Sequence, residues 1–417
     1  MGRTRSLALG MKFPPWLLAL GATLLAQSAA SFMGQCLPVV APLLTASTGV
    51  APERIGDLSS LTSFGTVLFL AFGSAFLARL GPVRTLQCGA VLSALALVMA
   101  ASGWWPVLVV SALLLGVGYG PTPPAGSRIL MATSPPQHRT LIFSIKQAGA
   151  PAGGALAGLV VAPFAAAFGW PSALLLAIVA GSVSALAISP LRRMMDAERD
   201  RGRAIHPRAL LQRQNLLAPV VALRGSRLLV SITALSVSFS VVQGTLFSFG
   251  VTYLTERGAG LEQAGFAYAC MQGAGVFARV FLGWLGDRTG QPSANLTAQA
   301  FIAGLLVILY ALMPADASLL FVVVVSTAVG FFGASWNGIY MAEVARLSPP
   351  DRVADATSGS TLFTFLGYVA GPSLFALAVP AFGWSVPFVA VGVQMILMGV
   401  LQTVILIRLG RARPPFN

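Results

Sequence analysis

Long apolar runs alternate with short polar connections along the sequence. Most runs hold about 20 residues, the length at which an α-helix crosses the ~30 Å hydrocarbon core of a bilayer. The pattern predicts an all-α membrane protein with twelve spanning helices in two groups of six. The first six are expected at residues 16–44, 57–78, 85–102, 106–131, 140–166 and 170–190. The second six are expected at residues 228–254, 262–284, 296–313, 317–342, 353–379 and 385–407.

Composition indicates a surface that faces lipid rather than water. Of the 417 residues, 56% are apolar and 9% are charged, whereas soluble domains carry about 25% charged residues. This excludes a soluble enzyme, a secreted disulfide scaffold and, despite the net charge of +14, a nucleic-acid binder. Cys36, Cys88 and Cys270 lie in apolar runs without metal-ligand spacing and are interpreted as buried small side chains. No nucleophile–base or metal constellation is visible, so we expect no enzyme activity, cofactor or metal.

Basic residues predict the orientation, because Lys and Arg gather in cytoplasmic connections. The odd-numbered connections contribute only Arg54 and Arg257. The tails and even-numbered connections hold Arg3, Arg5, Lys12, Arg79, Arg84, Arg139, Arg288, Arg346, Arg352, Arg408, Arg411 and Arg413, besides nine arginines in the stretch 191–227. We therefore expect a multi-pass protein of a bacterial plasma (inner) membrane with both termini in the cytoplasm.

The stretch 191–227 is then a cytoplasmic linker between an N-terminal half, 1–190, and a C-terminal half, 228–417. It is interpreted as a solvated connection, with a short helix on anionic lipid headgroups as the alternative.

Self-comparison reveals an internal duplication. Residues 53–56 (ERIG) recur as 262–265 (EQAG), and Arg79 and Gly81 recur as Arg288 and Gly290, all at an offset of 209. Ser134-Pro-Pro recurs as Ser348-Pro-Pro and Phe168-Gly-Trp as Phe382-Gly-Trp, both at an offset of 214. Four short matches in one order at nearly one spacing predict two parallel six-helix repeats.

This layout resembles the major facilitator superfamily of secondary transporters. The resemblance is sharpened by residues 283–290, which read G-W-L-G-D-R-T-G and match the superfamily's cytoplasmic signature G-x-x-x-D-R-x-G. The first-half counterpart, residues 74–81, keeps Arg79 and Gly81 but has Ala78 in place of the aspartate. Topology and duplication extend the resemblance over about residues 14–410.

The resemblance implies a gating role for the signature residues Gly283, Asp287, Arg288 and Gly290, with Arg279, Arg79 and Gly81 beside them. Asp287 would latch onto the start of the fifth span near Thr140, where a helix N-terminus carries about half a positive charge. Arg288 and Arg279 would tie neighbouring helix ends together. Because Ala78 cannot make the equivalent latch, the cytoplasmic gate is expected to be asymmetric. The alternative reading is a tight solvated turn whose arginine sets topology.

Lys146 is the one ionisable residue that stands out within a span, and such residues are costly in lipid. Gly149, Gly153 and Ala157 form a smooth stripe beside it for close helix packing. Packing roles are also expected for Pro151 and Gly154 on this helix and for Gly371 and Pro372 on the eleventh span. The superfamily's antiporter motif G-P-x-x-G-G is not matched in spacing here, so antiport stays open. Lys146 either attracts an anion in a central cavity or extends towards the headgroups.

Other polar and aromatic residues near mid-span are candidates for lining the same cavity. They are Gln27, Gln35, Tyr119, Gln147, Gln243, Gln272, Trp336, Asn337 and Tyr368. Each buried amide either contacts a solute or bonds a neighbouring helix. As a group with Lys146, they suit a small polar or monoanionic solute.

We therefore expect a secondary active transporter of a small organic or inorganic anion, such as a monocarboxylate, that works by alternating access. Two alternatives stay open: an efflux antiporter for amphipathic drugs, and a non-transporting receptor or scaffold on the same fold. No Asp or Glu lies deep within a span, which weakens proton symport. A proton or an anion remains a candidate for co- or counter-transport. The expected partners are the solute and membrane lipid, not nucleic acid, and the chain is expected to function as a monomer.

Overall fold

The computed structural model describes residues 14–135, 138–197, 199–202, 223, 226–349 and 353–411. Within these residues twelve helical segments are long and apolar enough to cross a membrane. This confirms the predicted all-α membrane fold. The stretch 191–227 lies largely outside the described residues, as do Arg3, Arg5, Lys12, Arg352, Arg413 and His206.

The first six segments are built from ten helical elements. They are α1 (Pro15–Thr48), η1 (Pro52–Arg54) with α2 (Ile55–Phe72), α4 (Pro82–Ala100), α5 (Trp105–Tyr119) with α6 (Thr122–Thr133), α7 (Arg139–Leu156) with η3 (Ala157–Val161) and α8 (Ala162–Phe168), and α9 (Trp170–Ala187). Short helices α3 (Ser74–Leu80), η4 (Ser189–Leu191) and α10 (Arg192–Met195) follow the second and sixth segments.

The second six segments are built from seven helices. They are α13 (Arg227–Glu256), α14 (Leu261–Thr289), α15 (Pro292–Ala311), α16 (Leu319–Gly333) with α17 (Asn337–Leu347), α18 (Val353–Phe382) and α19 (Ser385–Arg411).

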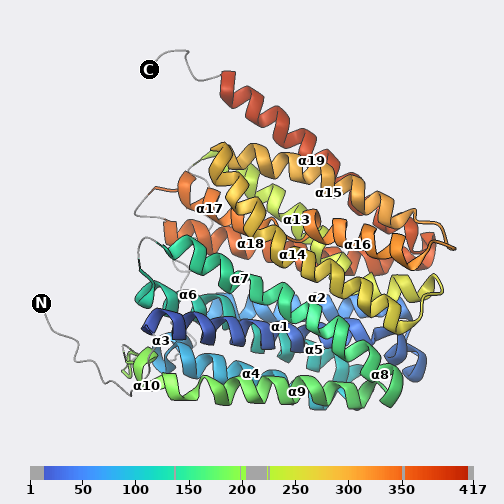
Figure 1. Cartoon of the computed structure of the whole chain (residues 1–417), viewed down its shortest axis with the longest axis horizontal. Helices are drawn as coiled ribbons and strands as arrows, with labels where there is room; N and C mark the ends of the chain where they lie inside the picture. Colours follow the sequence, from blue (N-terminus) through green and yellow to red (C-terminus); the bar gives the residue numbers. More distant parts are fainter. Residues whose placement is uncertain are drawn as a thin grey trace, which may run out of the picture.

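The helices lie side by side in two groups, blue to green below and yellow to red above (Figure 1). Within the groups α1 packs on α7 and α13 packs on α18, whereas α2–α18 and α7–α14 pack across the two groups. We call the end of the bundle that holds α3, α6, α10 and α17 the α3 end, and the opposite end, which holds α8, the α8 end (Figure 1). α1 begins and α19 ends towards the α3 end (Figure 1).

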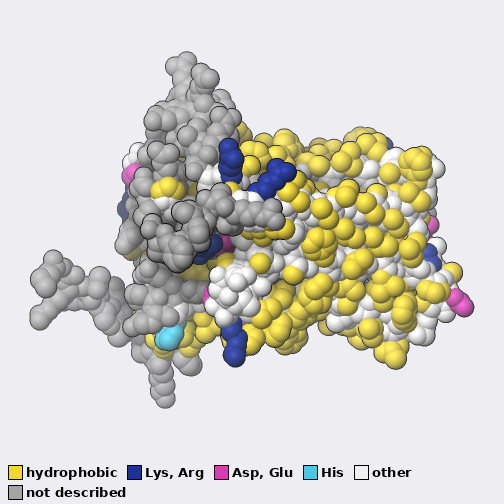
Figure 2. Space-filling view, turned by 90° about the horizontal axis from the view of Figure 1, so that it is seen from above, with side chains coloured by type: hydrophobic (Ala, Val, Ile, Leu, Met, Phe, Trp, Pro, Cys, Tyr) yellow, Lys and Arg dark blue, Asp and Glu magenta, His cyan; other side chains and the backbone are white. Residues whose placement is uncertain are grey.

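The outer surface agrees with a membrane environment. Figure 2 shows a face that is hydrophobic over most of its area, with charged side chains towards its two ends. Large apolar side chains such as Leu95, Leu186, Phe277 and Leu377 are exposed on it or on other faces of the bundle. In water such exposure would be unfavourable, whereas hydrocarbon chains accept it.

Three predicted spans are interrupted rather than continuous. The fourth span breaks between α5 and α6 at Gly120 and Pro121, where Pro121, Pro123 and Pro124 remove backbone donors. The tenth breaks between α16 and α17. The second stops at Gly73, over which the Phe69 ring packs, and the predicted end of this span belongs to α3.

The fifth span contains one wide turn. Its residues Ala157–Val161 form a π-helix between α7 and α8. Pro163, two residues beyond its end, lacks the N–H that an α-helical bond to Leu159 would need. The wide turn faces α14. It therefore lies on a contact between the two groups of helices.

Candidate functional site

One cavity of about 890 Å³ lies between the two groups of helices. Its wall includes Ser74, Ala75 and Leu77 of α3 and Met341 of α17, so the cavity reaches the α3 end. Its volume falls in the range of small-molecule sites. Nine of the ten residues predicted to line a binding site contribute to its wall, namely Gln27, Gln35, Tyr119, Lys146, Gln147, Gln243, Trp336, Asn337 and Tyr368.

Gln272 is the predicted lining residue that the structure places behind the wall. Its Nε2 donates to the Tyr268 hydroxyl at 2.9 Å, and that hydroxyl donates to Gln35 Oε1 at 2.7 Å. Gly154 makes room for this amide, because a Cβ at position 154 would lie 2.1 Å from Gln272 Nε2. The amide thus bonds a tyrosine of its own helix instead of facing the cavity, and this tyrosine joins α14 to α1.

Lys146 lies on the cavity wall and is only 2% exposed. Its stem occupies the space left by Gly126 of α6, where a Cβ would lie 2.7 Å from Lys146 Cε and 3.3 Å from Nζ. It forms no hydrogen bond or ion pair with a residue in the described part of the chain. Lys146 is therefore a buried basic group on the cavity wall.

Arg279 is a second basic side chain on the same wall, 7% exposed. Its Nη1 donates to the Gln147 carbonyl of α7 at 2.5 Å, and its Nη2 donates to the Ala334 carbonyl and to Asn337 Oδ1, both at 3.3 Å. It interacts electrostatically with Lys146. The sequence predicts Arg279 beside the gate, whereas the structure places it in the cavity, where it joins the two groups of helices.

The two groups use glutamines in a similar way. Gln27 of α1 donates to the Tyr119 hydroxyl at 2.8 Å, beside the break between α5 and α6. Gln243 of α13 accepts from Trp336 Nε1 at 3.0 Å, beside the break between α16 and α17, and from the Tyr368 hydroxyl at 2.8 Å. In each group, the first helix is thereby bonded to the interrupted fourth span of the same group.

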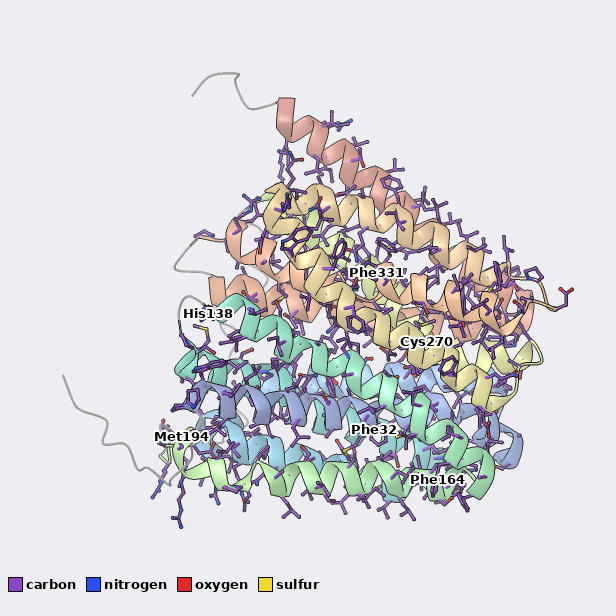
Figure 3. The ribbon with its side chains drawn as sticks, viewed as in Figure 1. Phe32, His138, Phe164, Met194, Cys270 and Phe331 are labelled. Carbon is purple, nitrogen blue, oxygen red and sulfur yellow. The ribbon has the colours of Figure 1, made fainter. Side chains whose placement is uncertain are left out.

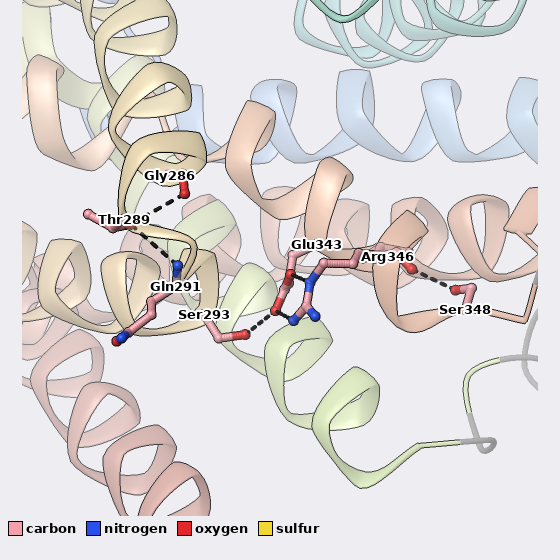
Figure 4. A network of polar contacts seen from close by, with 8 residues as sticks. Gly286, Thr289, Gln291, Ser293, Glu343, Arg346 and Ser348 are labelled. Carbon is pink, nitrogen blue, oxygen red and sulfur yellow. Dashed lines mark hydrogen bonds and ion pairs between the residues drawn. The ribbon is translucent and has the colours of Figure 1, made fainter. Parts of the chain in front are cut away.

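The one fully buried carboxylate of α17 is already paired. Glu343 is 0% exposed and accepts from Arg346 at 2.6 and 2.7 Å and from the Ser293 hydroxyl (Figure 4). It is not part of the cavity wall. No Asp or Glu side chain contributes to that wall among the residues that the structure describes, so Lys146 and Arg279 have no anionic partner there.

The signature residues 283–290 lie at the end of α14. Asp287 is exposed and has no hydrogen bond or ion pair with a described residue. The side chain of Thr140, its expected partner, is outside the described part. The Arg288 guanidinium lies 5.4 Å from the centroid of the Trp284 ring, Gly290 ends the helix at φ +64°, and Gly283 is half-buried.

In the first-half counterpart of this turn, a carboxylate arrives from the stretch that follows α10. Asp196, 1% exposed, accepts from the backbone N–H groups of Val83 at 2.8 Å and Arg84 at 3.1 Å. Gly81, at φ +85°, leaves the space that Asp196 occupies, while Arg79 is exposed. Asp196 cannot be recognised from the sequence, because nothing in the pattern distinguishes it from the acidic residues around it.

The predicted packing residues lie at close helix contacts. A Cβ at Gly149 would approach Leu24 of α1 to 3.1 Å, and one at Gly153 would approach the Ser28 carbonyl to 2.1 Å. Gly371 packs on Val241 of α13. Pro151 lies on the cavity wall, and Pro372 is both on that wall and against Gly56 of α2.

The cysteines and histidines form no site in the described residues. Cys36 is buried and Cys270 half-buried, but Cys88 is exposed, which corrects our expectation that all three are buried, because it faces outwards from α4. Figure 3 shows His138 at the α3 end and Cys270 on α14, well away from it. No group of three metal-ligating side chains is present in the part of the chain that the structure describes.

Comparisons with known proteins agree with this architecture. The profile described as Major Facilitator Superfamily matches residues 23–342. An uncharacterized MFS-type transporter of Mycobacterium tuberculosis is 26% identical over 357 residues, which cover 84% of this chain and 77% of the relative. A 4-hydroxybenzoate transporter of Pseudomonas aeruginosa is 29% identical over 279 residues, 60% of this chain and 61% of the relative.

Two further similarities cover different lengths of the chain. A hexuronate transporter of Bacillus subtilis is 27% identical over 152 residues, 36% of each chain. Among solved structures, a peptide transporter POT in complex with sulfate superimposes with a TM-score of 0.74 at 17% identity, covering 96% of both chains. At this identity the structural similarity concerns the fold alone.

Proposed function

The chain belongs to the major facilitator superfamily, and on this premise we propose that it is a secondary active transporter of a small organic anion, such as a monocarboxylate. The family and the twelve helical spans make it a membrane transporter of some solute. The class of solute is the proposal, and it depends on the chemistry of the cavity.

The observation that carries the proposal is the pair Lys146 and Arg279 on one cavity wall. They come from different groups of helices, both are more than nine-tenths buried, and no carboxylate of the described residues faces them. The Arg279 cation attracts an anion and repels a cation in a largely apolar interior, and a bound anion favours the charged form of Lys146 beside it. A carboxylate that enters from water gains hydrogen bonds to charged donors, which are stronger than neutral ones.

The substrates named for two relatives support an organic acid. Hexuronate and 4-hydroxybenzoate, after which those transporters are named, both carry one carboxylate group. The cavity adds aromatic surface from Tyr119, Trp336 and Tyr368, which suits the ring of such a molecule.

Alternating access is supported by the unequal ends of the cavity. At the α3 end the wall reaches α3 and α17. At the α8 end, α7 with its π-helix packs on α14 and α2 packs on α18. Because the basic connections lie at the α3 end, this end faces the cytoplasm in our proposal, and the structure corresponds to a carrier open to the cytoplasm.

The unpaired Asp287 fits the same state. In our proposal its latch to the start of α7 forms only when the cytoplasmic side closes, so the exposed carboxylate of the open side has no partner.

Uptake into proteoliposomes tests the proposed function. We expect saturable uptake of radiolabelled 4-hydroxybenzoate or glucuronate but not of a cationic dye. Lys146→Gln should lower kcat/KM for the anion about 10- to 100-fold, the equivalent of one lost hydrogen bond to a charged group. Arg257→Gln is the matched control, because this arginine lies outside the cavity and bonds the Met313 carbonyl.

Two outcomes would contradict the proposal. Uptake of the cationic dye in preference to both acids would favour the drug-efflux alternative. Failure of the wild type to bind or move either acid would remove the anion assignment.

A further inference from the structure

We propose that the carboxylate of the solute binds Arg279 at the start of α17, and that it displaces the Gln147 carbonyl from this arginine and so releases a link between the two groups of helices. The inference rests on the proposed function. It adds the position of the anionic group and the way in which its binding is coupled to movement.

The break in the tenth span provides one part of this subsite. α16 ends at Gly333 and α17 begins at Asn337, so the first backbone N–H groups of α17 have no partner within the helix. No side chain of the described residues caps this end. The eleven residues of α17 give its N-terminus a partial positive charge next to the cavity wall formed by Trp336 and Asn337.

The equivalent break in the first group does not offer the same donors. α6 begins Thr122-Pro123-Pro124, and the two prolines have no N–H. Although Pro123 and Pro124 line the cavity, they cannot bond an anion through the backbone. The start of α17 is therefore the more favourable of the two helix ends for a carboxylate.

Buried, unpartnered donors next to α17 provide the independent second observation. Arg279 Nε has no hydrogen bond within the described part of the chain, although the arginine is only 7% exposed. Lys146, equally without a partner there, lies on the same wall and interacts electrostatically with Arg279. A guanidinium binds a carboxylate through two parallel N–H bonds. Nη1 and Nη2 of Arg279 form one such pair once the Gln147 carbonyl is displaced, and Nε is a further buried donor without a partner in the described part.

The coupling follows from the other contacts of Arg279. Its Nη1 bond to Gln147, at 2.5 Å, joins α14 to α7, the same pair of helices whose packing closes the α8 end. A carboxylate is a stronger acceptor than a main-chain carbonyl and competes with it for the guanidinium. Anion binding from the α3 side therefore weakens the α7–α14 contact and lowers the free energy of opening at the α8 end.

The experiment measures binding and opening in the same full-length protein. Binding of radiolabelled 4-hydroxybenzoate and of glucuronate is followed by equilibrium dialysis. Opening is followed by labelling of Ser248→Cys, a cavity position on α13, with a membrane-impermeant maleimide added at the α8 side. Cys36, Cys88 and Cys270 are first replaced by alanine.

For the parent protein, we expect the bound acid to increase the labelling rate several-fold. Arg279→Gln should weaken binding at least 10-fold and raise labelling without ligand, and the acid should no longer change it. Arg279→Lys keeps the charge but not the bidentate geometry, so its acid affinity and labelling rate should lie between those of the parent and of Arg279→Gln. It replaces Arg279→Gln in the test if the glutamine variant does not fold. Arg257→Gln should behave like the parent in both measurements.

The possible negative results distinguish failure of this inference from failure of the proposed function. If the parent transports an acid but Arg279→Gln and Arg279→Lys bind it as tightly as the parent does, the inference is wrong while the proposed function stands. Ligand-independent labelling in the parent would remove the coupling step. If the parent binds neither acid, the proposed function itself fails.

Discussion

At the scale of single residues, a missing side chain determines where the cavity lysine lies. Gly126 of α6 faces the Lys146 stem, and any Cβ there would overlap Cε at 2.7 Å. The lysine can therefore lie flat against α6 with its ammonium group on the cavity wall. The position of this charge depends on glycine at 126 as much as on lysine at 146.

Gly126→Ala should displace the ammonium group without removing it. The new methyl group overlaps a flexible side chain rather than backbone, so the fold should persist, while the site loses its geometry. We expect KM for the transported acid to rise about 3- to 10-fold with little change in thermal stability, because a displaced charge weakens its contacts by about 1 kcal/mol. Uptake kinetics at several acid concentrations measure this.

Gly21→Ala is the control for Gly126→Ala, since nothing lies within 4 Å of a Cβ at position 21. Equal KM values for both variants and the parent would show that the location of the Lys146 charge is unimportant.

Some residues of the site are easier to predict from the sequence than others. Lys146 stands out because a single cation within an apolar run is conspicuous. Arg279 is predicted at the gate because the apolar run ends at residue 284, which places it near the interface. α14 continues to Thr289, so Arg279 lies about 15 Å before its end. Gln272 cannot be separated from the lining amides by pattern, because its direction depends on Tyr268 and Gly154, a tyrosine on its own helix and a glycine distant in sequence.

At the scale of the elements, a carboxylate from beyond α10 holds the start of α4. Asp196 accepts from the N–H groups of Val83 and Arg84, two of the donors that an isolated helix end leaves unpaired. In addition, the Asp200 N–H donates to the Ala78 carbonyl of α3 at 2.9 Å. These contacts attach the beginning of the linker to the turn that lacks the signature aspartate.

Asp196→Ala should destabilise the protein by about 1 kcal/mol, the usual effect of losing a helix cap. Thermal unfolding in detergent would show this as a lower midpoint. Asp200→Ala is the matched control, because this exposed carboxylate bonds only the nearby Gly202 N–H among the described residues. An unchanged midpoint for Asp196→Ala would contradict a capping role.

The pH dependence of the same site has a definite sign. Burial raises the pKa of Asp196 above its ordinary value, against the opposing effect of the Val83 and Arg84 N–H groups and of Arg192 and Arg199. The folded chain then binds this proton more tightly than the unfolded chain, so stability falls as pH rises from about 4 through the folded pKa. Asp196→Asn, which cannot titrate, should lack this part of the profile.

The helices themselves are largely predictable from the sequence, but their interruptions are not. A hydropathy run records only that the side chains are apolar, and α5 with α6 is as apolar as an unbroken helix. Pro121, Pro123 and Pro124 are visible in the sequence, yet membrane helices often tolerate proline. The break before α17 contains no proline. The Ala334 carbonyl at this break accepts a hydrogen bond from Arg279, a partner that the local sequence pattern cannot reveal.

At the scale of the whole molecule, the α8 end is closed by contacts between small residues of opposite groups. A Cβ at Gly265 of α14 would lie 2.4 Å from Ala162 Cβ and 2.8 Å from the Gly158 carbonyl. Gly56 of α2 is equally close to the Pro372 carbonyl. Closure at this end thus requires that backbones approach closely, and one methyl group is enough to oppose it.

Gly265→Ala should shift the carrier towards a state open at the α8 end. Overpacking of this kind costs about 1–3 kcal/mol, or roughly a 10- to 100-fold change in the equilibrium. We expect faster labelling of Ser248→Cys from the α8 side and slower uptake of the acid. Gly273→Ala on the same helix is the control, since a Cβ there meets nothing within 4 Å. Identical labelling of the two variants would contradict the closing role of Gly265.

The global arrangement follows from the internal duplication more than from any single motif. Two six-helix repeats, with basic residues concentrated in the even-numbered connections of both, predict the superfamily layout. The family match confirms that the chain has this fold. The state of the carrier cannot be predicted in this way. In our proposal both states use the same spans and differ in which interface is packed, Gly158 with Gly265 or Asp287 with α7.

The π-helix in the fifth span has a geometric consequence for the chain beyond it. Residues 157–161 accommodate one residue more than regular winding would over the same rise. If the same residues followed regular α-helical winding instead, everything before them would be rotated by about 100° relative to α8. The glycines at 149 and 153 would then turn away from α1, and Lys146 would turn away from the cavity. The wide turn therefore sets the rotation of α7 about its axis, and with it the side chains that α7 presents to its neighbours.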